Sequence, residues 1–500
     1  MKITFCVSED ENLGVELLSY YLKKHGHEVD LVFNPKQFDK AYTRNKKLAQ
    51  YFDWKKINLQ QLKAQKPDLV GFSCVTATYP WAVEFAKMIK KELNVPIIFG
   101  GVHPTLKPKI VMDNPEIDMV CIGEGEDALL ELCDSFEQTG KFRTDIRNIW
   151  SRDGNKIIKN EIRNLVENID QFEMDRKMFF DKLPSNYRTS AYFVMSRGCP
   201  FNCTYCGNEQ KRKIYQGKGK YVRQKSVDQA IKELIDLKNL GTKHVLFVDD
   251  VLTMNREWFK EFIVKFKNQI GLPFTCFIHP KMFDDEEAKL LKENGCKLIW
   301  YGIQSGSEKV RREILARYES DAEIEKAAEI CHQNGLKFMI DHIFDIPFDI
   351  EPIESARLYN KIRPQMINCY NLLYFPSAKI IEHALRAGNL QDQDVYKINR
   401  AKSITYQTGA LSEKSAESRD FYREYALLLT VIPLLSKRTV DKILISERRI
   451  RFFGKLPLIL IPMVKVILNF RVGHGFIPMA VLNTEIFWLR EFFKVKFKKK

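Results

Sequence analysis

Three cysteines in one short loop restrict this chain more than any other feature. Cys199, Cys203 and Cys206 stand at C-x3-C-x2-C spacing among glycine, proline and asparagine residues. The apolar run at residues 191–195 that precedes them is typical of a buried strand. The pattern therefore predicts a loop of three thiols at the point where a strand ends.

Three thiols are compatible with two kinds of metal site. A structural zinc site needs a fourth ligand close by, and the next candidates, His244 and Cys276, lie far along the chain. A cubane iron–sulfur cluster with only three protein ligands keeps one iron open for a substrate or cofactor. We expect the iron–sulfur cluster, and a zinc knuckle or a chance group of buried thiols is the alternative.

The same loop, with Tyr205 just before the third cysteine, resembles the radical S-adenosylmethionine (SAM) superfamily. The resemblance implies a [4Fe-4S] cluster whose open iron chelates the amino and carboxylate groups of SAM. It makes Cys199, Cys203 and Cys206 the metal ligands and catalytic residues, and it places Tyr205 among the cofactor-binding residues.

Length and cysteine usage indicate a multidomain protein of a reducing compartment. At about 150 residues per domain, a chain of 500 residues is expected to form about three domains. Its eleven cysteines are irregularly spaced, and its first residues lack a basic segment followed by a long apolar one. We therefore expect a cytoplasmic protein in which the other eight cysteines act as small buried apolar residues.

The positive charge of the chain is concentrated at one end. Of the formal net charge of +15, residues 436–500 contribute most, with fifteen Lys and Arg against four Asp and Glu. The rest of the chain is close to neutral. The basic composition therefore gives no reason to expect a nucleic-acid partner.

Residues 1–141 alternate short β-rich runs with helical runs. This rhythm predicts a doubly wound, Rossmann-like parallel sheet that binds ligands at the carboxyl ends of its strands. The loops expected there are rich in glycine, which lets a planar ligand approach the backbone, and in short hydrogen-bonding side chains. The candidate ligand contacts in these loops are Asn12, Gly14, Ser73, Thr76, Gly100, Gly101, His103, Gly123, Glu124 and Gly125.

These loops, with the segments ENLG, GHEV, GGVHPT and CIGEGE, resemble the cobalamin-binding domain that precedes many radical SAM cores. The resemblance implies cobalamin as a further cofactor. The Asp-x-His-x-x-Gly loop that gives cobalt a lower His ligand in other cobalamin enzymes is absent between Ser8 and Gly14. We expect His103 to shape the pocket wall or to bond corrin side chains, so that no protein His ligates cobalt; a role as cobalt ligand is the alternative.

The middle of the chain divides into a connection and a second α/β region. Residues 142–188 are expected to be a linker with a short hairpin, whose turn contains Asp153 and Gly154. Residues 189–400 return to a βα rhythm of six units. Six units predict a partial (β/α)6 barrel with its site at the carboxyl ends of the strands.

Two segments of this region resemble SAM-binding motifs of the family. Asp249 and Asp250 follow a β-rich run, where the family's second-strand motif receives the SAM ammonium, and helix capping is the alternative for Asp250. Gln304, Ser305 and Ser307 match the fourth-strand motif that contacts the SAM ribose or carboxylate. Most relatives have Glu where Gln304 stands, so the uncharged amide departs from the pattern.

The fifth strand departs further from the family. Asp341 and Asp345 stand where glycines usually pass the adenine of SAM, so we expect crowding there. His279, Pro280 and Tyr374 are expected to face the substrate, with an ordinary loop or wall role as the alternative.

Residues 401–500 are expected to form a helical basic region. The apolar runs at residues 426–435 and 456–464 are well below the ~20 residues needed to cross a bilayer. Basic residues interleaved with aromatic ones, as at residues 487–500, are typical of an interfacial membrane anchor. A small helical domain packed on the barrel, with a solvated basic tip, is the alternative.

Together these features predict a radical SAM enzyme that uses a [4Fe-4S] cluster, SAM and cobalamin. The resemblance implies C-methylation of an unactivated carbon, driven by an external flavodoxin- or ferredoxin-type electron donor. The basic terminal region favours a lipid-like substrate and a peripheral position on the inner face of the membrane. A radical cyclase or oxidative rearrangement on the same scaffold, or a non-catalytic corrin or metal sensor, is the alternative.

Overall fold

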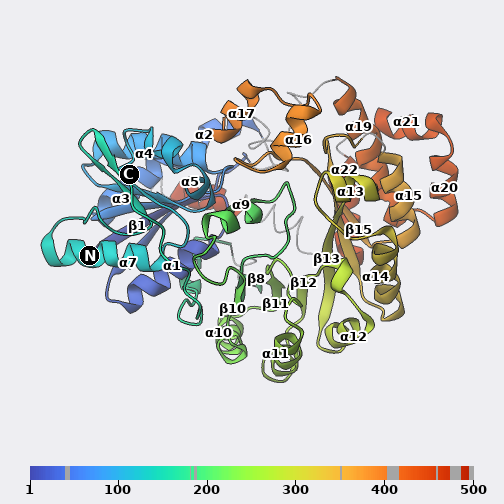
Figure 1. The fold of residues 1–500 in the computed structure, drawn as a ribbon, viewed down its shortest axis with the longest axis horizontal. Coiled ribbons are helices and arrows are strands. Elements are labelled where there is room, and N and C mark those ends of the chain that lie inside the picture. Colours follow the sequence, from blue (N-terminus) through green and yellow to red (C-terminus); the bar gives the residue numbers. More distant parts are fainter. Residues whose placement is uncertain are drawn as a thin grey trace.

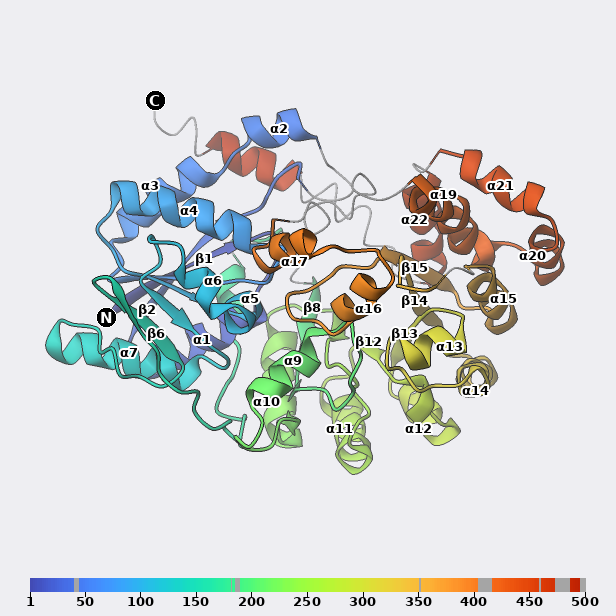
Figure 2. The ribbon, with the colours of Figure 1, turned by 45° about the horizontal axis from the view of Figure 1, so that its top comes forward.

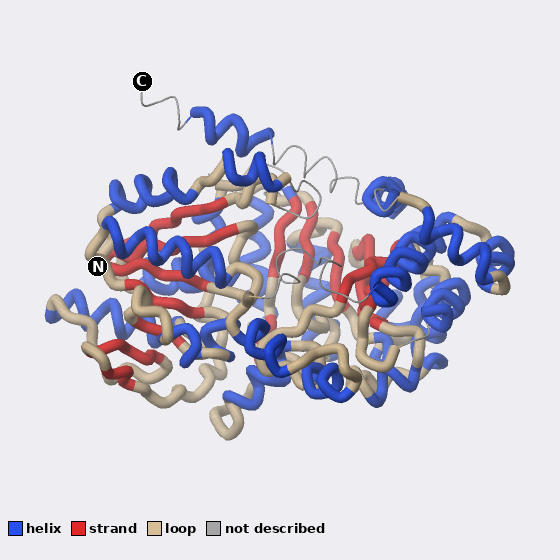
Figure 3. Tube along the Cα trace, turned by 90° about the horizontal axis from the view of Figure 1, so that it is seen from above, coloured by secondary structure: helices blue, strands red, loops and turns tan. Residues whose placement is uncertain are grey.

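The computed structural model describes residues 1–39, 45–180, 182–184, 189–349, 352–402, 416–457, 460–472 and 486–494. It contains two large sheets, which lie side by side in Figures 1 and 3. The sequence predicted this division into a doubly wound sheet, a partial barrel and a helical C-terminal region, and the architecture confirms it.

The first sheet has the strand order β2-β1-β3-β4-β5-β6-β7. Its strands β1 to β5 pair in parallel, and the hairpin β6–β7 adds an antiparallel edge. The hairpin expected within residues 142–188 therefore continues the first sheet. The bounds are β1 Lys2–Ser8, β2 Glu28–Asn34, β3 Leu69–Ser73, β4 Ile97–Gly100, β5 Met119–Cys121, β6 Ile149–Asp153 and β7 Lys156–Ile158.

The strands of this parallel sheet direct apolar side chains to both of its faces. Helices therefore cover both faces and bury these side chains. One core lies under α1 and α7, and the other lies under α3 and α4. The bounds are α1 Leu13–Lys24, α2 Lys46–Tyr51, α3 Lys55–Gln65, α4 Tyr79–Glu92, α5 Val102–Leu106, α6 Pro108–Met112, α7 Glu126–Thr139 and the 3-10 turn η1 Arg176–Phe179.

The second sheet is wholly parallel, in the order β15-β14-β13-β12-β11-β8. Because β8 and β15 remain at its edges, the six strands form an open, partial barrel. The strands are β8 Ser190–Phe193, β11 His244–Phe247, β12 Phe274–Phe277, β13 Cys296–Gln304, β14 Phe338–Phe344 and β15 Met366–Asn371, and a ribbon of β9 Ser196–Arg197 and β10 Arg223–Gln224 stands beside β8.

The helices between these strands start at side chains that suit a helix N-terminus. Ser226, Asn255, Asp284 and Ser320 each accept a hydrogen bond from a first-turn backbone N–H. The bounds are α9 Gly207–Ile214, α10 Val227–Asn239, α11 Arg256–Gln269, η2 Pro280–Met282, α12 Asp285–Glu293, α13 Glu308–Glu313, α14 Asp321–Gln333, α15 Pro352–Ile362, α16 Ile380–Arg386 and α17 Asp392–Asn399.

The apolar run at residues 426–435 packs on the open side of the barrel. Leu428, Leu429 and Ile432 are buried in the core of the second sheet. No described helix is long and apolar enough to cross a membrane alone; α21 and α22 meet that criterion only as a pair bent by 98°. The helices are α19 Ala416–Val431, η4 Ile432–Leu434, α20 Lys437–Leu444, α21 Glu447–Lys455 and α22 Leu460–Val472.

The last described helix, residues 486–494, crosses back to the first sheet, where Figure 2 shows it beside α2. Trp488 stacks on Phe33 at 5.4 Å between ring centroids and meets Trp54 edge-on at 5.3 Å. Phe492 is also buried there. This part of the terminal segment, expected to contact a membrane, is therefore committed to the protein core.

We predict that Trp488→Ala lowers the free energy of unfolding of the first sheet by about 3 kcal/mol, because it opens a cavity among buried aromatic rings. Urea denaturation followed by circular dichroism measures the loss. Arg490→Ala, at an exposed position of the same helix, is the control and should change stability by less than about 0.5 kcal/mol. Equal effects of the two variants would contradict the packing.

Candidate functional site

The three predicted cysteines lie in the loop after β9, at the carboxyl end of the second sheet. Gly198 makes the turn into this loop with φ +84°, and a side chain there would collide with the carbonyl oxygen of Tyr221. Thr204 ties the loop to the segment after α13, since its hydroxyl donates to the carbonyl oxygen of Ile314 at 2.7 Å.

The spacing of the thiols favours a cluster over a single metal ion. Sulfur ligands of one tetrahedral zinc lie under 4 Å apart, whereas a cubane holds each sulfur on a separate iron. Among the described residues, only His27, Asp134 and Glu137 bring three ligand atoms within 4.8 Å of one another, so the cysteines do not. Burial raises the pKa of Cys199 to about 12, so the thiolates need a strongly cationic partner.

Arg317 is the residue of this site that the sequence analysis missed. Its guanidinium donates to the hydroxyl of Tyr205 at 3.2 Å and to the carbonyl oxygen of Gly302 at 2.7 Å, and it lies 4.0 Å from Cys203 Sγ. The carboxylate of Glu319, which is fully buried, accepts a hydrogen bond from Nε of Arg317 at 2.5 Å. The site therefore contains a fixed positive charge beside the second cysteine. An Arg some dozen residues after Gln304 carried no distinguishing pattern.

His279 belongs to this same group. Its ring stacks on Phe201 at 4.1 Å, and its Nε2 is 3.9 Å from Glu319. Burial, with the positive charge of Arg317, lowers the pKa of His279 to about 4, so the ring is neutral. Pro280 follows at η2, and Tyr374 packs near Tyr205.

The two aspartates after β11 have different environments. Asp249 is buried and accepts hydrogen bonds from the backbone N–H of Met195 at 2.9 Å and the Ser196 hydroxyl at 2.5 Å. Asp250 is exposed and accepts one bond from the Asn208 amide at 3.0 Å. Asp249 therefore joins β11 to the cluster loop, and Asp250 is the carboxylate open to a ligand. Asn255, not Asp250, caps α11.

The motif after β13 is held in an unusual conformation. Gln304 has φ +71°, and its side chain covers Gly302 so closely that a side chain at 302 would collide with it. Its Oε1 is buried and accepts no hydrogen bond among the described residues. Ser305 accepts a bond from the Ser307 backbone at 3.1 Å, so this serine hydroxyl shapes the loop.

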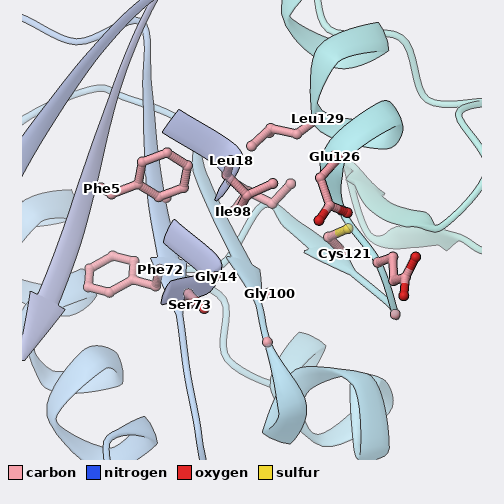
Figure 4. Close-up of a pocket in the computed structure, with 15 residues that line it drawn as sticks. Phe5, Gly14, Leu18, Phe72, Ser73, Ile98, Gly100, Cys121, Glu126 and Leu129 are labelled. Atoms are coloured by element: carbon pink, nitrogen blue, oxygen red, sulfur yellow. The ribbon is translucent and has the colours of Figure 1, made fainter. Parts of the chain in front are cut away.

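The carboxyl end of the first sheet holds a cavity of about 160 Å³ between the strands and the helices α1 and α7. Figure 4 shows Phe5, Ile98 and Leu129 around it. Much of the wall is glycine, which leaves room that side chains would fill. Of the predicted contacts, the residues that line this cavity are Gly14, Ser73, Gly100, Gly101, Gly123, Glu124 and Gly125. A flat, largely apolar ligand group fits this donor-poor wall.

The other predicted contacts of the first sheet have structural roles. Asn12 caps α1 by accepting from the Val15 backbone at 3.1 Å, and it also lines a second cavity of about 220 Å³. His103 is fully buried, stacks on Tyr79 at 4.2 Å and lies 3.3 Å from the hydroxyl of Thr76. Burial lowers the pKa of His103 to about 4. His103 is not among the residues that line either cavity, and its buried Nε2 has no hydrogen-bond partner among the described residues.

An ion cluster of four side chains joins the two sites. Glu124 and Glu126 follow β5 in the first sheet, whereas Arg197 and Arg223 come from the β9–β10 ribbon that leads into the cysteine loop. Arg197 contacts Glu124 at 3.2 Å and Glu126 at 2.6 Å. Arg223 pairs with both oxygens of Glu124 and donates to the carbonyl oxygen of Val166.

The surroundings of the ion cluster make it rigid. Tyr215 accepts a hydrogen bond from the Glu124 backbone at 2.6 Å, and Arg197 lies over the ring of Phe172 at 4.9 Å. Although burial opposes it, the two arginines hold the pKa of Glu124 below its usual value. Glu124 therefore positions the two sheets, a role that its loop sequence alone did not indicate.

We predict that Glu124→Gln destabilises the protein by about 3 kcal/mol, because it leaves the buried guanidinium of Arg223 without a carboxylate and removes one of the two carboxylates of Arg197. Adding Arg223→Met should recover at least about 1 kcal/mol, since one unpaired charge is then removed. Glu131→Gln, a surface ion-pair carboxylate on α7, is the control and should cost under about 0.5 kcal/mol. Thermal unfolding measures all three, and strictly additive losses would contradict the coupling.

Comparison with known proteins agrees with these two sites. Residues 7–133 match the B12 binding domain family, and residues 193–357 match the radical SAM superfamily. An uncharacterised methyltransferase of Pyrococcus horikoshii is 30% identical over 340 residues, which cover 66% of this chain and 72% of the relative. The hopanoid C-3 methylase of Methylococcus capsulatus is 23% identical over 78% of this chain and 72% of that protein.

A solved structure has the same fold. The radical SAM methyltransferase TsrM of Kitasatospora setae, with tryptophan substrate and a SAM analogue bound, superposes with a TM-score of 0.62 at 17% identity. The match covers 77% of this chain and 76% of that one.

Proposed function

This chain belongs to the family of cobalamin-dependent radical SAM methyltransferases, and on that premise we propose that it methylates an unactivated carbon of a lipid-like substrate. Its cofactors are a [4Fe-4S] cluster, SAM and cobalamin. When bound, they supply an electron, a radical able to remove a hydrogen atom, and the methyl group. The observation that carries the proposal is the ion cluster that joins the cysteine loop to the glycine-lined cavity.

The residues of the second sheet have separate tasks in this proposal. Cys199, Cys203 and Cys206 hold three irons, and the exposed carboxylate of Asp250 suits the SAM ammonium. Arg317 is the cation placed to pair with the SAM carboxylate, since it is fixed beside Cys203. Gln304 is the proposed hydrogen-bond acceptor for a hydroxyl of the ribose, because its amide oxygen has no partner among the described residues; that oxygen is buried, so the side chain has to turn toward the ligand.

The first sheet would hold the second cofactor, and the proposal assigns no protein ligand to its metal. The glycine-lined cavity accepts a flat group, and His103 stays in its stack, so the wall binds by shape and hydrogen bonds. We propose an external electron donor of flavodoxin or ferredoxin type as the reductant of the cluster.

We predict that the anaerobically reconstituted protein forms both 5′-deoxyadenosine and S-adenosylhomocysteine when reductant and substrate are present. Each of Cys199→Ala, Cys203→Ala and Cys206→Ala should abolish the cluster absorbance and SAM cleavage. Mass spectrometry of the nucleosides measures the outcome. 5′-Deoxyadenosine without S-adenosylhomocysteine would indicate a cyclase or rearrangement, and unchanged iron content in the three variants would contradict the site.

The lipid-like substrate is supported by the surface of α20, α21 and α22. Phe452, Met463 and Phe470 are each more than half exposed, although they are large apolar side chains. The same helices carry exposed cations, of which Arg448 and Lys455 make no ion pair among the described residues. Apolar side chains among cations suit an anionic lipid surface, so we place the protein peripherally on the inner face of the membrane.

We predict that the protein binds vesicles containing phosphatidylserine and that salt weakens the binding. Arg448→Ala and Arg449→Ala should each lower the affinity about fivefold, since a cation near anionic lipid contributes ~1 kcal/mol. Phe452→Glu should also weaken binding, and Tyr396→Glu, at an exposed aromatic on α17, is the matched control. Co-sedimentation measures the affinity; equal binding by all variants would contradict this surface.

A further inference from the structure

The two faces of the barrel sheet differ in exposure next to the cluster end. On the outer face of β13 and β14, Tyr301, Ile303, Ile340 and His342 are all buried beneath helices. On the inner face, Trp300, Gly302, Asp341 and Ile343 keep accessible surface, even though they lie in central strands. Since successive residues of a strand point to opposite faces, the inner face at this level is open to a ligand.

Asp341 is the charged side chain on this inner face. Its Oδ1 accepts hydrogen bonds from Trp300 Nε1 at 2.8 Å and from the Asn368 amide at 3.3 Å. Its Oδ2 has no hydrogen-bond partner among the described residues and is not buried. The carboxylate is thus oriented by two donors and presents one free acceptor oxygen.

The register of the sheet places this oxygen close to the cluster site. Asp341 pairs with Gly302 on β13 and with Asn368 on β15, so the three residues form one row across the sheet. Gly302 in that row accepts the Arg317 hydrogen bond described above. Asp341 is therefore a neighbour, in the same row of the sheet, of the carbonyl group that Arg317 contacts. Arg317 is the cation that we expect to pair with SAM.

Several large apolar side chains lie close to Asp341. Trp300 stacks on Phe277 at 4.8 Å, and both rings are only partly buried. Below them, Met339 and Met366 pack against Leu468 of α22 and close this end of the inner face. A molecule that lies against Asp341 therefore also contacts these aromatic and aliphatic side chains.

Neighbouring charges decide which donor this carboxylate accepts. Burial raises the pKa of Asp341 to about 6, against the opposing effect of its two hydrogen bonds and of the cations Lys465 and Arg317. Those two cations would repel a substrate ammonium but not a neutral hydroxyl. A hydroxyl also completes the acceptor without burying a second charge.

We propose that Asp341, held by Trp300 and Asn368, is the recognition residue for a hydroxyl group on an otherwise apolar substrate, such as an isoprenoid alcohol. This inference rests on the proposed methyltransferase function and adds the substrate class. From the sequence we expected Asp341 to crowd the adenine of SAM. In this proposal it binds substrate instead, and its carboxylate is oriented by the hydrogen bond from Trp300.

The test uses the reconstituted holoprotein at pH 7.5, where Asp341 is mostly ionised, and tritiated probes in equilibrium dialysis. The probes are farnesol, farnesyl methyl ether and farnesylamine, with geraniol and geranylgeraniol as alcohols of other lengths. We expect saturable binding of at least one alcohol. The ether and the amine of matching length should bind about tenfold more weakly. The ether has no O–H to donate to the carboxylate, and the ammonium of the amine is repelled by Lys465 and Arg317.

Three variants separate recognition from folding. Asp341→Ala should weaken alcohol binding about tenfold. Asp341→Asn should instead bind the ether better than the wild type does, since the new amide N–H₂ can donate to the ether oxygen. Trp300→Phe keeps the ring on Phe277 but frees the carboxylate, and should weaken alcohol binding about fivefold. Asp285→Ala, an exposed carboxylate of α12, is the matched control.

Absence of binding by every alcohol, equal binding of alcohol and ether, or unchanged alcohol binding in Asp341→Ala would each overturn the inference. SAM cleavage is measured in the same preparations. Loss of 5′-deoxyadenosine formation would show a failure of the proposed function, whereas intact cleavage with no binding of the alcohols would show that only the substrate class is wrong.

Discussion

The ion cluster of Glu124, Glu126, Arg197 and Arg223 is the contact on which the rest of the site depends. Each half of the molecule has its own sheet and core, and these side chains pair across the carboxyl edges of the two sheets. A buried ion pair adds little net stability because desolvation offsets its attraction. It does penalise wrong arrangements, since a displaced partner leaves a buried charge unpaired. Its value here is in specifying one relative placement of the two sheets.

The ion cluster is also linked to the chemistry by the covalent chain. Arg197 is followed by Gly198 and Cys199, and Ser196 before it donates to Asp249 at the end of β11. Only Gly198 separates the ion cluster from the first cysteine of the loop. Radical chemistry needs reacting groups held in a fixed geometry, and this short connection gives the protein a direct means of holding them.

The apolar residues of the helical C-terminal region face two environments. The run at residues 426–435 and the aromatic residues Trp488 and Phe492 are buried, and they tie the barrel edge and the first sheet into one body. Other apolar side chains of α21 and α22 stay exposed beside unpaired cations. The buried and the exposed segments have the same basic, apolar composition. Only their packing in the folded chain distinguishes the core helices from the candidate membrane surface.

Local pattern determined much of the architecture. The alternation of β-rich and helical runs specified both parallel sheets, and the C-x3-C-x2-C loop specified where the metal chemistry lies, because both depend on residues close in sequence. Helix caps such as Asn255 and Ser320 were likewise local.

Tertiary structure decided the roles of residues whose partners are distant in the chain. Arg317 lies more than a hundred residues from Cys203, and Glu124 about as far from Arg223, so no spacing rule connects them. Asp341 was expected to crowd the adenine, and only the sheet register showed that Trp300 and Asn368 orient it. The sequence by itself determined the sheets and the thiol loop because period and spacing encode them; the charges that position and recognise ligands were decided by folding, because a charge acts through space and not along the chain.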